Sequence, residues 1–324
     1  MSVVYVTGAT AGLGRAIASA FAAAGYDVGL IARDELALAD FSASLAANSA
    51  WAAADVADYP QLAQAAADLE SRIGPPDVWI NNAMATIFSR FDDILPEEFA
   101  RAIEVTLLGS VHGMQIALKS MKARGCGHII QIGSALAYRA IPLQAPYCAA
   151  KLAVRGAVDS LRCELIHDRS PLRVTMVHMP AMNTPQFDWA RRHVAQQPQP
   201  VPPIFAPEAC AKAVLWASRH PDRREVWVGK PTFAAILGNK LVPALMDYLM
   251  ARTAYESQFE RPAGEAGATG NLFHPVPGHR NAEGRFARRQ RDAVWWIGTS
   301  WRFEIAMIAA AVVAVAALIY GLVR

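Results

Sequence analysis

Residues 3–14 read Val3-Val-Tyr-Val-Thr-Gly-Ala-Thr-Ala-Gly-Leu-Gly14, and this stretch decides the fold. Its β-branched and aromatic start predicts a buried strand, and the Ala-rich residues that follow, up to Ala24, predict a helix. A glycine-rich turn between a strand and a helix is typical of dinucleotide binding. Gly8 permits the tight turn, Gly12 lets the backbone approach a pyrophosphate, and Gly14 lets the helix pack on the strand. The phosphates would meet the positive end of that helix.

Strands and helices continue to alternate as far as residue 228. Six further strands are expected, at Asp27–Ala32, Trp51–Ala53, Asp77–Ile80, His128–Ile132, Arg173–His178 and Glu225–Val228. Helices are expected between them, at Glu35–Ala47, Tyr59–Ile73, Leu95–Ala123 and Glu208–Ser218. This alternation predicts an α/β fold of the Rossmann type, with a doubly wound parallel sheet of about seven strands and right-handed crossovers.

The segment from Ser134 to Lys151 carries the candidate chemistry. Ser134 follows an apolar strand, and Pro146 marks the start of a helix that bears Tyr147 and Lys151 four residues apart. That spacing places the phenol and the ammonium on the same helix face. A cation beside a phenol favours the phenolate, so we expect the lysine to lower the pKa of Tyr147 from about 10 toward neutrality. Such a group suits acid–base work on a carbonyl or an alcohol.

These motifs, together with Asn81-Asn-Ala83, resemble the short-chain dehydrogenase/reductase family in its ordinary, non-extended form. The resemblance covers about the first 230 residues, with the motifs in the family's order and at its distances. It implies that Ser134 holds and polarises the substrate oxygen and that Tyr147 exchanges the proton. Lys151 would lower the pKa of the tyrosine and bind the nicotinamide ribose.

The resemblance also assigns the cofactor site. Asp55 would contact the adenine ring, Asn81 would support the cofactor from a strand end, and Thr184 would contact the carboxamide or the phosphates. The full set of expected cofactor-binding residues is Thr7, Gly8, Thr10, Gly12, Leu13, Gly14, Arg33, Asp55, Val56, Asn81, Ala83, Tyr147, Lys151, Pro180 and Thr184.

Three residues depart from the family pattern. Met84 and Ala181 stand where glycine is usual, and Thr106 stands where an asparagine commonly holds a water in a proton relay behind the lysine. A threonine hydroxyl can bond water with shorter reach. We therefore expect Thr106 to take part in an altered relay, since the family's contact is partly made by the backbone.

The end of the second strand indicates the cofactor. An acidic residue there bonds the ribose 2′-hydroxyl of NAD, whereas an arginine accommodates the 2′-phosphate of NADP. Arg33 comes first, which predicts NADP(H), because a guanidinium–phosphate contact is strong. Asp34 follows directly and keeps NAD(H) as the alternative. Asp34 can otherwise be read as a residue of the first helical turn, favoured there by the helix dipole.

Composition narrows the class of protein. The 324 residues are 53% hydrophobic, and the net charge of +3 is too small to argue for nucleic acid as a partner. The four cysteines lack metal-ligand spacing and a disulfide pattern, so no metal is expected and the protein fits a reducing compartment. Met1 lies directly against the first strand, which leaves no room for a signal peptide.

The C-terminal third divides into three expected parts. Residues 231–260 form a helical extension, interrupted by Pro243, that is either a core or dimer element or the mouth of a site for a lipophilic substrate. Residues 261–294 read as a linker without core residues, so a chain cut after about Gly284 should still fold. Residues 295–324 read as a membrane anchor.

The anchor contains nineteen residues without a charge, Ile305 to Val323. At about 1.5 Å per residue, such a helix just crosses a ~30 Å hydrocarbon layer. Trp295, Trp296 and Trp301 form an aromatic belt before it. Arginines 285, 288, 289 and 291 precede the belt and place the catalytic domain, residues 1–230, on the cytoplasmic side. A buried core helix is the alternative.

The expectation for function is a single-pass membrane protein that interconverts a carbonyl and an alcohol with NADP(H), on a lipophilic small molecule. The alternative is a catalytically weakened nucleotide-binding sensor or scaffold subunit at the membrane, which Met84, Thr106 and Ala181 motivate. Homo-oligomers are compatible with either. The sequence leaves the substrate and the direction of the reaction open.

Overall fold

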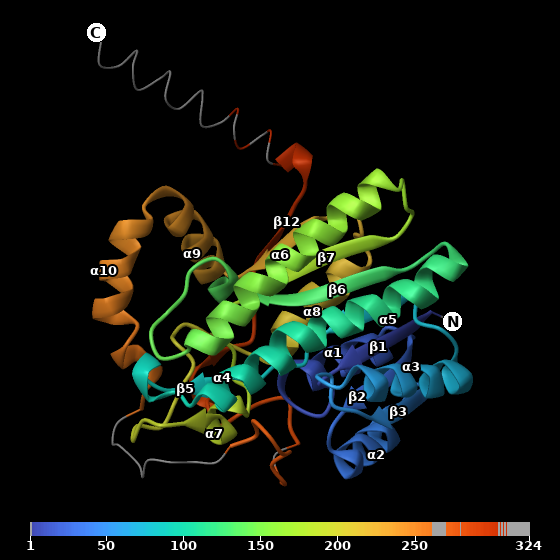
Figure 1. Cartoon of the computed structure of the whole chain (residues 1–324), viewed down its shortest axis with the longest axis horizontal. Coiled ribbons are helices and arrows are strands. Elements are labelled where there is room, and N and C mark those ends of the chain that lie inside the picture. Colours follow the sequence, from blue (N-terminus) through green and yellow to red (C-terminus); the bar gives the residue numbers. More distant parts are fainter. Residues whose placement is uncertain are drawn as a thin grey trace.

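A single central sheet with helices on both faces organises the chain (Figure 1). The computed structural model describes residues 2–260, 270–278 and 280–303, together with residues 305, 307 and 309. Across the sheet the strands follow in the order β12 (Trp296–Thr299), β10 (Glu225–Val228), β7 (Arg173–Met179), β6 (His128–Ser134), β4 (Val78–Asn81), β1 (Val3–Thr7), β2 (Asp27–Ala32) and β3 (Ser49–Ala53). Seven of these strands are parallel, which confirms the predicted Rossmann-type sheet.

Two helical layers cover the sheet, each with its own hydrophobic core. One core contains buried side chains of α3 (Tyr59–Ile73), α4 (Pro96–Ile103), α5 (Gly109–Arg124) and α6 (Ala145–His167). The other contains buried side chains of α1 (Gly12–Ala23), α2 (Glu35–Ser44) and α8 (Pro207–Ser218). Because both faces are covered, strands such as β1 and β6 are buried along their whole length, as expected for a parallel sheet.

The strand order creates the position of the site. Along the chain the sheet first grows from β1 through β2 to β3, and then restarts with β4 on the other side of β1. The connections after β1 and β4 therefore run to opposite faces of the sheet. They leave a crevice at the carboxyl ends of the strands, which is where open α/β sheets bind ligands.

The sheet has one strand more than predicted, and this corrects the expected end of the domain. β12 pairs antiparallel with β10, with Glu225 opposite Thr299 and Val228 opposite Trp296. Trp296 therefore lies in a sheet strand that covers the edge of β10. The prediction that the sheet is complete at Val228 is wrong, because the apolar residues that follow made this short aromatic strand resemble an interfacial belt.

The described part of the expected linker also packs on the domain. Leu272 is fully buried in one core, and Phe286 is buried beside Phe187. A short strand, β11 (Gln290–Arg291), pairs with β9 (Ile204–Phe205). The expectation that this segment carries no core residues is therefore wrong. Its Gly and Pro content reflects an irregular path over the surface of the domain.

Smaller elements complete the fold. Helices α9 (Lys230–Leu241) and α10 (Pro243–Thr253) lie at one side of the molecule (Figure 1). The helical extension is interrupted before Pro243, as predicted. The remaining short elements are β5 (Ile87–Phe88), the 3-10 turns Phe91–Asp93, Ala135–Ala137, Glu256–Gln258 and Ala287–Arg289, α7 (Gln186–Trp189) and β8 (Arg191–Arg192).

The predicted membrane span, Ile305 to Val323, lies outside the described residues except at positions 305, 307 and 309. Among the residues that the structure describes, none of the helices combines the length and the apolar character needed to cross a bilayer.

Candidate active site

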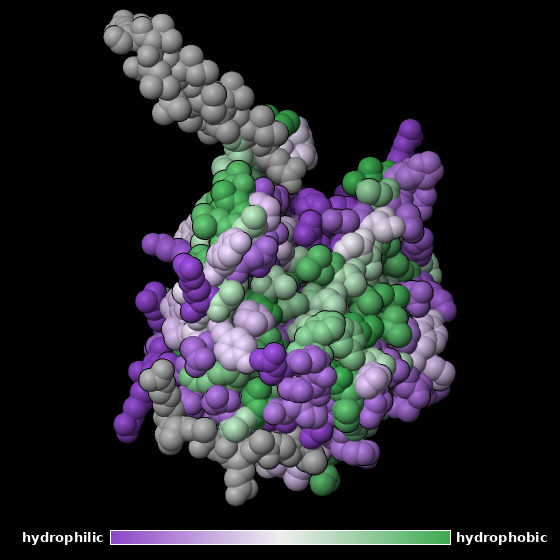
Figure 2. Space-filling view, turned by 60° about the vertical axis from the view of Figure 1, so that its left-hand side comes forward, coloured by the Kyte–Doolittle hydropathy of each residue, from purple (hydrophilic) through white to green (hydrophobic). Residues whose placement is uncertain are grey.

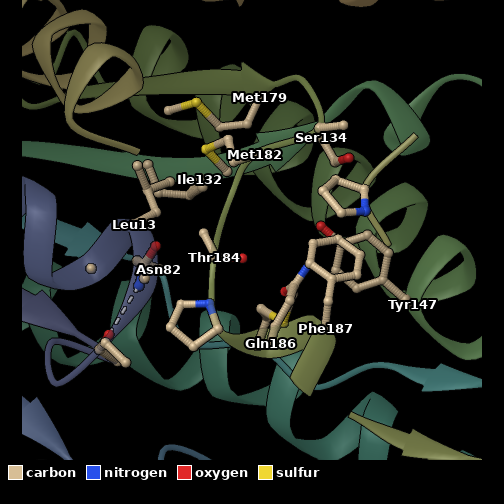
Figure 3. A pocket seen from close by; sticks show the side chains of 18 of the residues that line it. Leu13, Asn82, Ile132, Ser134, Tyr147, Met179, Met182, Thr184, Gln186 and Phe187 are labelled. Atoms are coloured by element: carbon tan, nitrogen blue, oxygen red, sulfur yellow. Dashed lines mark hydrogen bonds between the residues drawn. The ribbon is translucent and has the colours of Figure 1, made fainter. Parts of the chain in front are cut away.

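A cavity of about 800 Å³ opens at the carboxyl ends of the strands. Its walls come from the glycine-rich turn after β1, the ends of β2, β4, β6 and β7, the helix α6, and the segment from Gln186 to Pro203. Figure 3 shows Leu13 and Asn82 at one end of this cavity and Ser134 and Tyr147 at the other. The predicted nucleotide-binding turn and the predicted reactive residues therefore share one site.

Ser134 and Tyr147 meet although thirteen positions separate them in the chain. Ser134 is the last residue of β6, and Tyr147 lies in the first turn of α6. Both side chains line the cavity, Ser134 lies close enough to lower the pKa of Tyr147, and the Ser134 Oγ accepts from the Leu136 backbone N–H at 3.1 Å. Strand end and helix start thus hold two hydroxyls where one substrate oxygen could contact both.

The protonation state of Tyr147 differs from the prediction. Burial raises the pKa of Tyr147 to about 12, against a smaller lowering by the hydrogen bond with Ser134. The Lys151 Nζ lies 5.7 Å from the centre of the phenol ring. The expected lowering of this pKa by the lysine is therefore wrong for this arrangement. Burial destabilises the phenolate more than the charge of the lysine stabilises it.

Lys151 is buried one turn further along the same face of α6. Its Nζ donates to the Ile132 backbone oxygen at 2.8 Å, and its side chain is 2% exposed. Burial lowers the pKa of Lys151 to about 8. An ammonium has three N–H donors, so two remain for a ligand in the cavity.

The glycine-rich turn is built so that only small residues fit. A Cβ on Gly14 would lie 2.0 Å from the Gly8 oxygen, and Gly8 and Gly12 have φ angles of +66° and +57°. The Asn82 amide donates to the backbone oxygens of Thr7 at 3.0 Å and Gly8 at 3.2 Å, which clamps the turn from β4. This role of Asn82 was not predicted, although the position of Asn82 directly after a strand end was an available signal.

Arg33 and Asp34 reach the site at the end of β2 and have different roles. Asp34 caps α2, since its Oδ1 accepts from the Ala37 N–H at 3.0 Å. Arg33 lines the cavity, but its guanidinium donates to backbone oxygens of residues 271–273 at 2.6–3.3 Å. The predicted arginine is thus in place, while much of its hydrogen-bonding capacity is used by the chain itself.

Several other predicted residues line the same cavity. They are Thr10, Leu13, Asp55, Val56, Ala83, Pro180 and Thr184. Asp55 also forms an ion pair with Arg101, and its Oδ1 accepts from the Ala57 N–H at 3.0 Å. Met84 and Ala181, which replace glycines of the family pattern, both line the cavity as well.

Two predicted cofactor residues support the site from behind and do not line the cavity. The Thr7 Oγ1 accepts from the backbone N–H groups of Asn82 at 3.0 Å and Ala83 at 3.2 Å. The Asn81 side chain accepts from the Trp79 indole at 2.7 Å and donates to the Ser110 oxygen at 3.1 Å. Both residues are buried and fix the turn after β4.

Thr106 lies outside the cavity lining, and its place in an altered proton relay stays a prediction. It sits in a π-helical turn, Glu104–Leu108, between α4 and α5. Its hydroxyl accepts from the Ala85 N–H at 2.9 Å and donates to the Ala85 oxygen at 3.1 Å. Its own backbone oxygen accepts from the Ser110 hydroxyl at 2.8 Å. Thr106 therefore holds the turn before β5 in place, and its hydroxyl proton is directed to the Ala85 oxygen.

A buried polar group stands behind Ser134. The His178 Nδ1 lies 3.2 Å from the Ser134 backbone oxygen, and its Nε2 lies 3.6 Å from a Glu225 oxygen. Burial lowers the pKa of His178, and the same histidine helps to lower the pKa of Glu225 to about 2. His178 is fully buried, so it positions the end of β6 and does not face the cavity.

The residues fit a nicotinamide dinucleotide. The glycine turn leaves no room for side chains against a pyrophosphate. Among the described residues, the α1 N-terminus has no side-chain cap, although its Gly12 N–H donates to the Asn281 oxygen, and two donors of Lys151 have no partner. A cavity of about 800 Å³ lies within the size range of ligand sites. The residues that would hold the cofactor are those of the glycine turn with Asp55, Lys151 and Thr184.

Comparison with known proteins gives the same answer. The short chain dehydrogenase family matches residues 2–194. An uncharacterized oxidoreductase of Bacillus subtilis (strain 168), YxnA, is 33% identical over 267 residues, which cover 81% of this chain and 75% of that protein. The mouse dehydrogenase/reductase SDR family member 7B is 34% identical over 183 residues; these span 54% of this chain and 56% of the mouse protein.

Solved structures are similar as well. An alcohol dehydrogenase from the archaeon Thermococcus sibiricus, complexed with 5-hydroxy-NADP, is 26% identical with a TM-score of 0.58, over 70% of this chain and 95% of that one. An actinorhodin polyketide ketoreductase with NADPH is 30% identical with a TM-score of 0.54, over 57% and 72%. With Ser134, Tyr147 and Lys151 in one cavity beside a glycine-rich turn, this chain belongs to the short-chain dehydrogenase family of NAD(P)-dependent oxidoreductases.

Proposed function

We propose that the protein is a membrane-anchored, NADP(H)-preferring oxidoreductase that reduces the carbonyl group of a lipophilic substrate to an alcohol. One observation carries the chemistry: the hydroxyls of Ser134 and Tyr147 meet in the cavity, with the Lys151 ammonium buried on the same helix face. The cofactor supplies the hydride when it is bound. The chain supplies the proton and the geometry.

The proton chemistry favours reduction near neutral pH. With a pKa of about 12, the Tyr147 hydroxyl keeps its proton at pH 7 and can give it to a carbonyl oxygen. Ser134 would hold that oxygen through its own hydroxyl. Alcohol oxidation needs the phenolate as a base, so its rate should rise as the pH rises toward this pKa.

Lys151 would position the cofactor. Below its pKa of about 8 the ammonium is charged, and one N–H is fixed by the Ile132 oxygen. The other two would hold ribose hydroxyls. This arrangement keeps a cation near the phenol and ties cofactor binding to the helix that carries Tyr147.

Two observations support NADP(H) over NAD(H). Arg33 provides a positive charge at the end of β2 and lines the cavity. The Asp34 carboxylate caps α2, which argues against Asp34 as the acid that binds the ribose. The archaeal alcohol dehydrogenase and the polyketide ketoreductase, which share the fold, were solved with NADP-type cofactors.

A lipophilic substrate fits the remaining walls of the cavity. They include Phe187 beside Tyr147 and Met179 and Met182 near Ile132 (Figure 3), and on the C-terminal helices Ala235 and Met250. Apolar walls with a few polar groups are typical of sites for apolar small molecules.

The surface next to these helices supports a membrane setting. Leu241, Leu245 and Tyr248 on α9 and α10 are 63–76% exposed, and Trp301 is 65% exposed. Figure 2 turns this side of the molecule forward and shows hydrophobic side chains at the surface among polar ones. Exposed apolar patches mark interaction surfaces. With nineteen uncharged residues at 305–323, they favour a bilayer that also delivers the substrate, with the catalytic domain on the cytoplasmic side.

The test is consumption of NADPH by detergent-extracted full-length protein with a panel of lipid-like ketones and aldehydes, and matched short polar carbonyls as controls. We expect turnover on the lipophilic members, and a membrane fraction that keeps the protein through salt and carbonate washes. Cofactor binding without turnover on any carbonyl would favour the sensor or scaffold function. Release by salt alone would contradict the anchor.

A further inference from the structure

The segment of residues 270–291, described except for position 279 and here called the strap, lies across the adenosine half of the cavity. Asn271, Pro275, Val276 and Arg280 of the strap line the cavity together with Arg33 and Ala54. The Gly12 backbone N–H of the glycine turn donates to the Asn281 oxygen at 3.0 Å. The buried Leu272 anchors the strap in the core. The strap is therefore a wall of the cofactor site.

Arg33 organises this wall. Its Nη1 donates to the oxygens of Leu272 and Phe273, and its Nη2 donates to the oxygen of Asn271. These bonds use three of the five N–H donors of a guanidinium. Arg33 keeps its charge at the site, with two of its N–H donors left for a ligand.

Arg280 brings a second guanidinium from the strap to the same end of the cavity. Its Nη1 binds the exposed Asp40, whereas its Nη2 lies 3.9 Å from the nearest Asp34 oxygen, too far for a hydrogen bond. Its Nε is buried and lacks an acceptor among the described residues. The Nη2 group, by contrast, can offer N–H donors to an acceptor in the cavity that Arg280 lines.

We propose that Arg280 binds the 2′-phosphate of NADP(H) and is the main determinant of cofactor choice, while Arg33 positions the strap that carries it. This inference rests on the proposed preference for NADP(H). The Nη2 group offers charged N–H donors, which suit a phosphate oxygen. Asp34 and Asp40 lie beside Arg280. Without Arg280 the phosphate would therefore face two carboxylates, and Arg33 would be the remaining cation that we identify for it.

The experiment measures ligand binding, independent of turnover. Isothermal titration of the full-length protein in detergent gives Kd values for NADPH, NADH, 2′,5′-ADP and 5′-AMP. For Arg280→Gln we expect Kd to rise about ten- to hundredfold for the two 2′-phosphorylated ligands and less than about twofold for the others. Arg280→Lys should fall between, because a lysine keeps the charge but loses the fork. Arg288→Gln, at an exposed arginine of the strap outside the cavity, is the matched control.

A second variant guards against loss of folding. Asp40 is exposed and pairs with Arg280, so Asp40→Asn should strengthen NADPH binding several-fold and leave NADH binding unchanged. If Arg280→Gln weakens all four ligands alike, Arg280 only staples the strap to α2, and the inference is overturned while the NADP(H) preference stands. If the wild type binds NADH as tightly as NADPH, the proposed preference itself fails and the inference with it.

Discussion

Replacing Lys151 with methionine should stabilise the protein while removing its activity. Lys151 is 2% exposed, and burial lowers its pKa from 10.5 to about 8. At about 1.4 kcal/mol per pKa unit, holding the charge in the folded state costs about 3 kcal/mol at pH 7. Loss of the hydrogen bond to the Ile132 oxygen lowers the free energy of unfolding by about 1.5 kcal/mol. The net gain of about 1–2 kcal/mol should raise Tm by about 3–6 °C.

The pH dependence identifies the cause. Because the folded pKa of Lys151 lies below the unfolded value, the unfolded chain binds more protons between about pH 8 and 10.5. Wild-type stability should therefore gain from this residue as the pH rises through that window, and the full cost should be present below pH 8. The advantage of Lys151→Met is expected at pH 7 and should vanish near pH 10.5.

The assay is thermal unfolding of both proteins at pH 7 and pH 10.5, with Lys212→Met as the control at an exposed lysine of α8. The control should shift Tm little and equally at both pH values. A Lys151→Met protein that is less stable than the wild type at pH 7, or equally stabilised at both pH values, would refute the argument that this lysine is held at a cost for function.

Three further proteins test how the C-terminal part of the chain packs on the domain. Arg33→Gln should weaken both NADPH and NADH binding several-fold, and NADPH binding somewhat more, because it removes three hydrogen bonds that hold the strap and also a charge. Unchanged NADH binding in titrations would argue against the strap contacts. A chain ending after Gly284 should aggregate or unfold in a solubility and circular-dichroism assay, because it loses β12 and bares the edge of β10, whereas a chain ending after Phe303 should fold and bind cofactor; a well-folded shorter chain would contradict the role of β12.

Much of the nucleotide half of the fold could be predicted from local patterns. The strand, glycine turn and helix of residues 3–24 are contiguous, so one short stretch of sequence contains the whole pattern. The same holds for Tyr147 and Lys151, whose spacing on α6 follows from helix geometry alone. Ser134 could be identified because it is the last residue of the apolar strand β6.

The rest depended on contacts between distant parts of the chain. Pairing of Trp296 with Val228, and of Arg33 with residues 271–273, joins segments that local patterns treat separately. The pKa of Tyr147 could not be inferred from its spacing to Lys151, since burial by the surrounding walls decides it. The contacts of the Thr106 hydroxyl with both backbone groups of Ala85 also join segments that local patterns treat separately.

The most direct test of hydride transfer with Tyr147 as proton donor is isotope transfer. NADPH carrying deuterium at the reacting C4 position is incubated with the full-length protein and a carbonyl substrate identified in the screen. The alcohol product is then analysed by mass spectrometry. We expect one deuterium on the carbinol carbon of the product, and a Tyr147→Phe protein that binds NADPH normally but forms little labelled alcohol. Alcohol without deuterium from either labelled face of the cofactor, or a Tyr147→Phe protein that keeps wild-type turnover, would contradict it.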